Sequence, residues 1–305
     1  MLKGYAFLLI PLLLGFLLSK IKFVPKSTAS VLNFFVINIA LPATILVSIK
    51  NITLSYDLLI PVAAQWIALI ITALIVVGVS YFFKFSRLVT GTLLLVVPLG
   101  NTAFLGLSII PVFFDNGAVS YGIMYDQLGS FLALATYGAV VASAYGKSKY
   151  VNPKILVVKV ITFPPLIFLV IGFLLKDYSI PLPLSNLLSL LSKALVPAAM
   201  IAIGLNVSLK VERQLFRPLI SALLIRLILV PIILILSFFT LGLTGLAAQV
   251  SVFQSAMPSM ITAAVLASDK GLDKTLATSI VSIGLIISLA TLPLIYYLIE
   301  LILIR

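Results

Sequence analysis

Long runs of apolar residues recur along the whole chain, and charged or Gly- and Pro-rich stretches separate them. Each run is near twenty residues long, which is the length an α-helix needs to cross the hydrocarbon core of a bilayer. The pattern therefore predicts an all-α polytopic membrane protein with ten transmembrane helices. They are expected at residues 4–20, 30–49, 57–83, 88–114, 118–145, 155–176, 185–208, 215–241, 246–268 and 273–302.

Composition favours the same class of protein. The 305 residues are 62% hydrophobic and 9% charged, and a soluble domain this apolar could not cover its surface with polar groups. The first apolar run has no cleavage site of small residues behind it, so it is predicted to be a membrane span and not a signal peptide.

The chain contains no Cys and no His. Disulfides, thiol catalysis, the commonest metal ligand and the commonest general base are therefore excluded. The sequence also lacks a nucleotide-binding loop, an HExxH motif and the pair of intramembrane Asp residues that an aspartyl protease needs. We therefore expect neither an enzyme nor a cofactor or metal site.

The net charge of +12 is distributed unevenly over the predicted loops. Four basic residues fall on one side of the membrane: Lys3, Lys50, Lys176 and Arg305. Fourteen fall on the other side: Lys20, Lys22, Lys26, Lys84, Arg87, Lys147, Lys149, Lys154, Lys159, Lys210, Arg213, Arg217, Lys270 and Lys274. The positive-inside rule makes the second side cytoplasmic and places both termini outside the cell membrane. No nucleic-acid partner is needed to explain the charge.

The two halves of the chain repeat one another. Pro42 in Leu-Pro-Ala corresponds to Pro197 in Val-Pro-Ala at an offset of 155 residues, and Leu134-Ala135-Thr136 corresponds to Leu289-Ala290-Thr291 at the same offset. Each half contains five predicted helices, an odd number, so the second copy enters the membrane upside down. We predict an inverted repeat, with helices 1–5 in residues 1–146 and helices 6–10 in residues 147–305.

Two predicted spans are interrupted by polar, helix-breaking stretches, at residues 98–106 and 254–259. Pro removes a backbone donor, Gly adds an entropic cost, and Asn, Thr and Ser offer competing hydrogen bonds. Inside a bilayer, backbone opens only where it faces protein or a water-filled cavity. Matched breaks in the fourth and ninth helices therefore predict a binding site where these two helices cross.

The candidate substrate contacts are the polar and backbone-exposing residues of the two breaks. They are Gly100, Asn101, Thr102, Gln254, Ser255, Pro258 and Ser259. Half-helix N-termini favour an anion, and an Asn or Gln amide can donate to a carboxylate. The alternative is a pair of kinked helices that pack closely through small residues.

Several polar side chains lie within other spans. Asp126 and Arg226 could pair with each other, have separate partners, or act in coupling, and Asp126 could carry a proton because burial disfavours a charged carboxylate. Lys193 could snorkel to the outer interface or contact substrate. Asn38, at the corresponding repeat position, could join helices or bind ligand.

Together these motifs resemble the auxin efflux carrier family, which includes the PIN-type exporters. The resemblance covers about residues 5–300 and rests on Gly100-Asn101-Thr102-Ala103-Phe104-Leu105-Gly106, Tyr125-Asp126-Gln127, Arg226-Leu227-Ile228-Leu229-Val230-Pro231, Ala256-Met257-Pro258-Ser259 and Leu41-Pro42-Ala43. Two features depart from the family pattern. Ser108 stands where the family usually has Pro, and the long cytoplasmic loop of plant PIN proteins is missing.

The resemblance implies a scaffold built from helices 1, 2, 6 and 7 and a moving transport domain built from helices 3–5 and 8–10. It also implies broken helices 4 and 9 that cross at the substrate site, and a homodimer formed through the scaffold. Asp126, Gln127 and Arg226 would be polar supports within the transport domain.

We therefore expect a secondary transporter that exports a small organic anion, an auxin-like carboxylate or a dicarboxylate, by an elevator-type mechanism. An anion leaving the cytoplasm runs down the membrane potential and needs no coupling ion. A cation- or proton-coupled symporter similar to bile-acid carriers is an alternative, although neither break supplies an acid for a sodium site. A non-transporting membrane sensor is a second alternative, and a channel is a third that the matched breaks disfavour.

Overall fold

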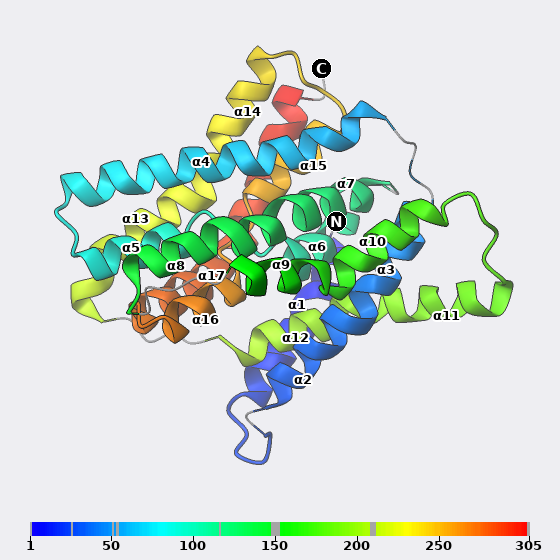
Figure 1. Ribbon diagram of the computed structural model, residues 1–305, viewed down its shortest axis with the longest axis horizontal. Helices are drawn as coiled ribbons and strands as arrows, with labels where there is room; N and C mark the ends of the chain where they lie inside the picture. The colour runs from blue at the N-terminus through cyan, green and yellow to red at the C-terminus, as the bar shows by residue number, and fades with distance from the viewer. Residues whose placement is uncertain are drawn as a thin grey trace. The chain divides into compact units, whose positions relative to one another are not determined.

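The computed structural model (Figure 1) describes residues 2–25, 27–50, 52, 55–115, 117–147, 153–207 and 212–303. Throughout these residues the regular structure is helical, apart from a single antiparallel bridge between two residues. Four residues that contribute to the predicted charge asymmetry lie outside the described ranges: Lys26, Lys149, Lys210 and Arg305.

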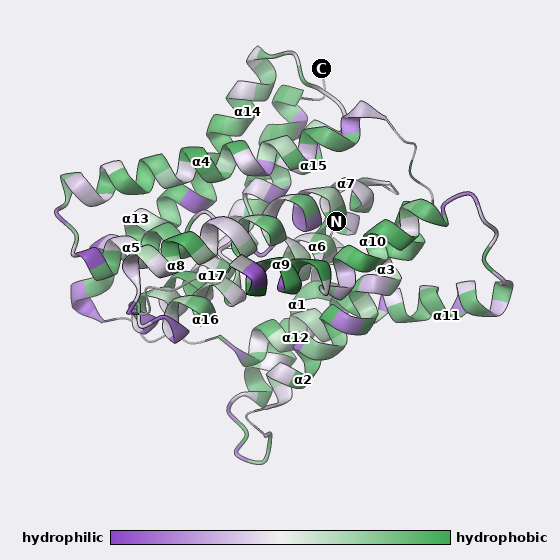
Figure 2. Cartoon of the chain, viewed as in Figure 1, coloured by the Kyte–Doolittle hydropathy of each residue, from purple (hydrophilic) through white to green (hydrophobic). Residues whose placement is uncertain are grey.

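Six helical stretches of the described chain are long and apolar enough to cross a membrane: Thr28–Ile49, Tyr56–Phe82, Ala118–Tyr145, Leu182–Leu205, Arg213–Thr240 and Lys274–Leu303. Shorter apolar helices cover Leu8–Leu18, Arg87–Val96, Thr102–Phe113 and Pro164–Leu174. The chain is thus an all-α, multi-pass membrane protein. Figure 2 shows hydrophobic residues along most of these helices.

The chain divides into two compact units. Unit 1 comprises Met1–Ser55, Ala103–Ile123 and Val158–Val207, and unit 2 comprises Tyr56–Thr102, Met124–Val157 and Ser208–Arg305. The helices of unit 1 are α1 (Leu2–Leu18), α2 (Thr28–Phe35), the π-helix η1 (Val36–Ala40), α3 (Leu41–Ile49), α6 (Leu107–Phe113), α10 (Pro164–Leu174), α11 (Leu182–Lys193) and α12 (Leu195–Leu205), with nearly all of α7 (Ala118–Met124).

Unit 2 holds the other helices that lie within a single unit. They are α4 (Leu59–Phe82), α5 (Arg87–Val96), the π-helices η4 (Tyr125–Phe131), η5 (Leu134–Gly138) and η7 (Ile225–Leu229), α8 (Ala139–Tyr145), α13 (Phe216–Leu224), α14 (Val230–Thr240), α15 (Leu246–Ser255), α16 (Ile261–Asp269) and α17 (Lys274–Leu303), with the short 3-10 helices η2 (Tyr56–Leu58) and η6 (Arg213–Leu215). The π-helix η3 (Thr102–Gly106) and α9 (Pro153–Ile161) each cross a boundary between the units.

One predicted helix is interrupted where the sequence analysis expected none. The range 155–176 divides into α9 and α10, which are separated by Thr162 and Phe163. Pro164 and Pro165 follow directly, and Phe163 is extended, with φ −73° and ψ 114°. Because a residue before proline is disfavoured in the α region, α9 ends there and the first proline begins α10. The prediction of one continuous helix was therefore wrong.

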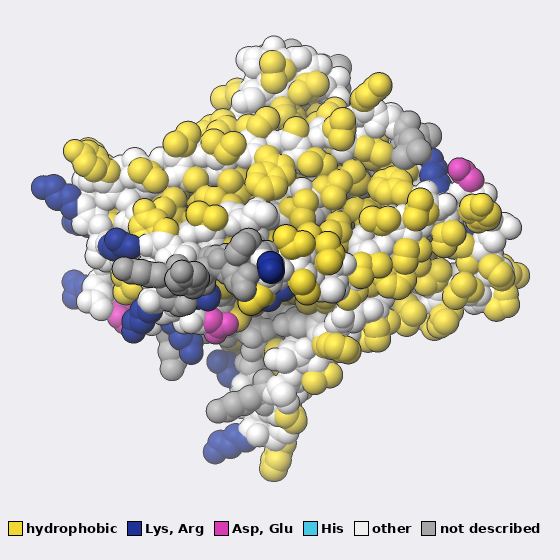
Figure 3. All heavy atoms as spheres, in the orientation of Figure 1, with side chains coloured by type: hydrophobic (Ala, Val, Ile, Leu, Met, Phe, Trp, Pro, Cys, Tyr) yellow, Lys and Arg dark blue, Asp and Glu magenta, His cyan; other side chains and the backbone are white. Residues whose placement is uncertain are grey.

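The helix α4 has the packing pattern of a lipid-facing helix. Its buried face carries small and polar residues, among them Ala64, Gln65 and Ala68. Several of its large apolar side chains point outward, so that Ile70 is 54% and Leu74 67% exposed. Apolar side chains also cover the visible surface over α4 in Figure 3. Small residues facing protein and large ones facing lipid are typical of membrane helices.

Glycines allow α1 and α12 to approach closely within unit 1. A Cβ atom built on Gly15 would overlap the carbonyl oxygen of Ile201, and one built on Gly204 would overlap that of Leu12. The contact is therefore one of backbone against backbone, for which glycine is the residue that fits.

We expect Gly15→Ala and Gly204→Ala each to lower the stability of the purified protein by about 1–3 kcal/mol, because neither backbone can yield without moving a helix. Thermal unfolding in detergent measures the effect. Gly78→Ala is the matched control, because no atom lies within 4 Å of a Cβ at this position in α4. An equal loss in all three variants would contradict the packing argument.

Candidate functional site

The interruptions expected in the fourth and ninth predicted helices are present in unit 2. The helices α5 and α15 end at Val96 and Ser255, and each is followed by five non-helical residues, 97–101 and 256–260. Each stretch contains a proline, Pro98 or Pro258, which has no backbone N–H to continue a helix. The predicted breaks at residues 98–106 and 254–259 overlap these stretches but extend into helix, because Thr102–Gly106 forms the π-helix η3 and residues 254–255 end α15.

The two non-helical stretches pair with each other. The backbone N–H of Asn101 donates to the carbonyl oxygen of Pro258 at 2.7 Å, and that of Met260 donates to the carbonyl oxygen of Leu99 at 2.9 Å. Between these bonds, Gly100 and Ser259 form an antiparallel bridge pair. We call residues 99–101 and 258–260 the crossover bridge. It satisfies backbone groups that the broken helices leave free and that lipid could not satisfy.

The crossover bridge has two faces. Successive residues of an extended segment point to opposite sides, so Gly100 and Ser259 face one way while Asn101 and Pro258 face the other. We call these sides the Arg226 face and the Asn101 face. Because Gly100 and Ser259 are flanked by the two hydrogen bonds but do not make them, they form the closer kind of antiparallel pair, with Cα atoms about 4.5 Å apart.

Arg226 lies against the first of these faces and holds both interruptions. It stands in η7 and is 1% exposed. Its Nε donates to the carbonyl oxygen of Met257 at 2.7 Å, and its Nη1 donates to that of Pro98 at 3.3 Å. A Cβ atom on Gly100 would overlap Nη2 of Arg226, so glycine is required for this approach.

Asp126 fixes the end of the same segment from the π-helix η4. It is 3% exposed, and its Oδ1 accepts a hydrogen bond from Oγ1 of Thr102 at 2.5 Å, while its Oδ2 accepts one from Nε2 of Gln127 at 2.6 Å. Asp126 and Arg226 therefore have separate partners, which is one of the arrangements that the sequence left open, and do not form an ion pair.

The remaining candidates on α15 differ in their contacts. Gln254 is fully buried, and its Nε2 donates to the carbonyl oxygen of Thr102 at 3.3 Å. Ser255 instead donates its hydroxyl to the carbonyl oxygen of Val252, within its own helix, at 2.6 Å. Gln254 thus links α15 to the first interruption, whereas the Ser255 hydroxyl serves its own helix.

Asn38 and Lys193 belong to unit 1. The Nδ2 atom of Asn38 donates to the carbonyl oxygen of Phe34, one turn earlier in the same helical stretch, at 2.8 Å. Lys193, the last residue of α11, is exposed. Asn38 therefore uses its amide within its own helical stretch, which is neither of the two roles expected for it.

Sequence reasoning missed Gln65, a fully buried residue of α4. A Cβ atom on Gly129 would meet the Gln65 side chain at 2.7 Å, and the neighbouring Trp66 donates its indole N–H to the carbonyl oxygen of Leu128 at 3.2 Å. These contacts hold α4 against η4, which carries Asp126. A single amide within an otherwise apolar run was the signal that could have identified Gln65.

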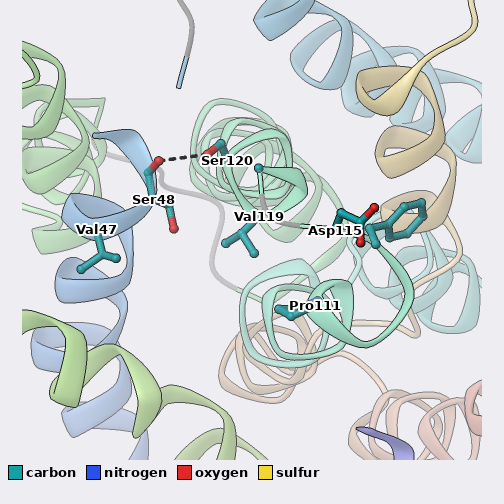
Figure 4. Close-up of a pocket in the computed structure, with 8 residues that line it drawn as sticks. Val47, Ser48, Pro111, Asp115, Val119 and Ser120 are labelled. Carbon is teal, nitrogen blue, oxygen red and sulfur yellow. Dashed lines mark hydrogen bonds between the residues drawn. The ribbon is translucent and has the colours of Figure 1, made fainter. Parts of the chain in front are cut away.

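A cavity of about 520 Å³ lies in unit 1 (Figure 4). Val47 and Ser48 of α3, Pro111 of α6 and Ser120 of α7 line it, and the Ser120 hydroxyl donates to the carbonyl oxygen of Ser48 at 3.2 Å. Asp115 also lines this cavity and brings a carboxylate that disfavours an anion. No cluster of three or more possible metal-ligating acids occurs among the described residues.

We expect Arg226→Met to lower stability by about 3 kcal/mol, because two buried carbonyl oxygens lose their donor. Thermal unfolding of the purified protein measures this loss. Arg217→Met, on the exposed surface of the preceding helix α13, is the control and should change stability by less than about 0.5 kcal/mol. Equal unfolding temperatures for the two variants would show that Arg226 does not hold the crossover.

Comparison with known proteins identifies the class to which this architecture belongs. Residues 2–296 match the family described as membrane transport protein. An uncharacterized transporter of Methanothermobacter thermautotrophicus is 29% identical over 294 residues, which cover 94% of both chains. An uncharacterized transporter of Methanocaldococcus jannaschii is 30% identical over 283 residues, covering 89% of this chain and 90% of the relative. The chain belongs to this membrane transport protein family, the auxin efflux carrier family whose motifs it carries.

Proposed function

We propose that the protein is a secondary transporter of a small organic anion and that the crossover bridge forms its substrate site. The observation that carries this proposal is the buried guanidinium of Arg226, whose two hydrogen-bond acceptors are neutral carbonyl oxygens. A buried positive charge without a carboxylate on it attracts an anion far more strongly than it would in water.

The Asn101 face suits a carboxylate. Asn101 is 4% exposed and precedes Thr102, whose carbonyl oxygen accepts a hydrogen bond from Gln254. Arg226 holds the backbone of the two interruptions at Pro98 and Met257. Two unit charges about 6 Å apart interact by roughly 3 kcal/mol at an effective dielectric constant of about 20. This exceeds the roughly 1 kcal/mol of a neutral hydrogen bond. Charge would therefore select an anion, and the amide of Asn101 would orient its carboxylate.

The mechanism we propose is elevator-type alternating access by ten helices arranged as two inverted repeats, 1–146 and 147–305. Helices 1, 2, 6 and 7 would form the scaffold and dimer interface, helices 3–5 and 8–10 would carry the substrate, and both termini would lie outside. Two features support this organisation. A ten-residue α-helix precedes a five-residue interruption in each half. Predicted helices 1, 2 and 7 fall in unit 1 and predicted helices 3, 8, 9 and 10 in unit 2, although unit 1 also contains Ala103–Ile123 from predicted helices 4 and 5.

Export by uniport is the direction we favour, because the membrane potential contributes about 2.3 kcal/mol per charge per 100 mV to the exit of an anion. One observation keeps a proton-coupled alternative open, namely that Asp126 is a buried carboxyl group close to the crossover. Both of its oxygens accept hydrogen bonds from Thr102 and Gln127, which favours a supporting role.

In proteoliposomes, we expect Asn101→Ala to reduce carboxylate flux by roughly tenfold or more, because it removes a donor to a charged group. A panel of mono- and dicarboxylates, tested with an imposed membrane potential, identifies the substrate class. Asn206→Ala is the control, since the Asn206 amide donates within its own helix to Ala202. Wild-type flux in Asn101→Ala, or no flux of any carboxylate in the wild-type protein, would overturn the proposal.

Asp126→Asn distinguishes support from proton coupling. The asparagine oxygen can still accept from Thr102, and the Gln127 amide can turn to accept from the new NH2 group because its Oε1 has no other partner. Uniport with a structural Asp126 therefore predicts potential-driven flux within about threefold of wild type. Uptake that depends on a pH gradient in the wild type and loses that dependence in Asp126→Asn would establish coupling instead.

A further inference from the structure

The Arg226 face of the crossover bridge carries two buried polar groups that no atom of the described residues satisfies. The Nη2 of Arg226 and the Oγ of Ser259 have no hydrogen-bond partner in the described part of the chain, although their residues are 1% and 2% exposed. Buried polar groups are almost always hydrogen-bonded, so a ligand is the natural partner for both.

The bridge geometry places these two groups near each other. Gly100 and Ser259 form a pair whose Cβ positions lie about 4.5–5.5 Å apart. Nη2 of Arg226 lies 1.9 Å from the position that a Cβ atom of Gly100 would take, so it is on the same side of the bridge as the Ser259 side chain. The two groups do not bond to each other. This separation allows one acceptor atom to lie within hydrogen-bond distance of both.

A third donor is available in the same region. The hydroxyl of Tyr125 is buried and has no hydrogen-bond partner among the residues that the structure describes. Tyr125 precedes Asp126, whose carboxylate binds Thr102, two residues beyond Gly100. Tyr125 also lies within electrostatic range of the Arg226 guanidinium.

We propose that the Arg226 face binds one small monovalent anion between Nη2 of Arg226 and Oγ of Ser259, with the Tyr125 hydroxyl as a further donor. The ligand is an anion because the strongest of these donors is charged and its other partners are neutral. It is monovalent because a second negative charge would be buried without compensation. It is small because all three residues are almost fully buried.

An inorganic halide and a carboxylate group share this chemistry. The carboxylate case rests on the proposed function, whereas a halide would bind whether or not the protein transports organic anions. The guanidinium of Arg226 is the positive charge that would attract an anion on either face of the bridge. An anion on the Arg226 face and a carboxylate on the Asn101 face therefore weaken each other's binding by the same factor.

The test is thermal unfolding of the purified full-length protein at constant ionic strength, with gluconate replaced stepwise by chloride, bromide or acetate. A specific ligand raises the unfolding temperature in a concentration-dependent way. We expect Ser259→Ala to weaken that response at least tenfold. Ser255→Ala should leave it unchanged, because the Ser255 hydroxyl is bound to Val252.

Tyr125→Phe provides a second variant should Ser259→Ala not fold. It should also weaken the response, whereas Tyr137→Phe, whose hydroxyl donates to the carbonyl oxygen of Leu94 at 2.8 Å, should not. A response to chloride and bromide alone assigns a halide, and a response to acetate alone assigns a carboxylate group. A response to both classes of anion supports a site for either.

The inference fails if none of the three anions shifts the wild-type unfolding temperature, or if Ser259→Ala and Ser255→Ala respond equally. Asn101→Ala separates it from the proposed function. That variant should lose flux and keep the anion response, because Asn101 lies on the other face. Loss of the response in Asn101→Ala with retention in Ser259→Ala would place the anion on the Asn101 face and overturn this inference alone.

Discussion

Satisfying the backbone of two broken helices is the constraint on which the rest of the described site depends. Lipid offers no hydrogen bonds, so N–H and C=O groups released at Pro98 and Pro258 must find partners in the protein. The crossover bridge provides two such bonds, and Arg226 donates to one carbonyl oxygen from each stretch. Gly100 follows from this arrangement, because a side chain there would displace the guanidinium.

Under the proposed function, the same arrangement leaves a buried positive charge that a substrate anion would meet. Arg226 is held by neutral oxygens, while Asp126 is engaged by Thr102 and Gln127. Because the two charges have separate partners, the positive one is not neutralised by the negative one through an ion pair. Both residues lie in π-helical segments, η7 and η4, and such segments often occur at functional sites. The wider turn of a π-helix leaves local backbone groups free for contacts such as that of Trp66 with Leu128.

Packing in the two units follows the rules of a bilayer. On α4, small and polar residues face protein while Ile70 and Leu74 face outward. In unit 1, Gly15 and Gly204 bring two backbones into contact. In both cases van der Waals contact replaces the hydrophobic effect as the force that joins helices, because lipid tails are as apolar as the side chains.

The sequence by itself determined the class of protein, the helical character of the apolar runs and the location of both interruptions to within a few residues, because apolar run length and the Pro, Gly and Asn residues of the breaks act locally. It did not predict the end of α9 before Pro164, although the paired prolines were visible, and it overlooked Gln65 within an apolar run. Only the tertiary structure decided that Asp126 binds Thr102 while Arg226 binds Met257 and Pro98. Opposite charges on two helices are equally compatible with an ion pair or separate partners, and the choice depends on which backbone carbonyls the fold brings within reach.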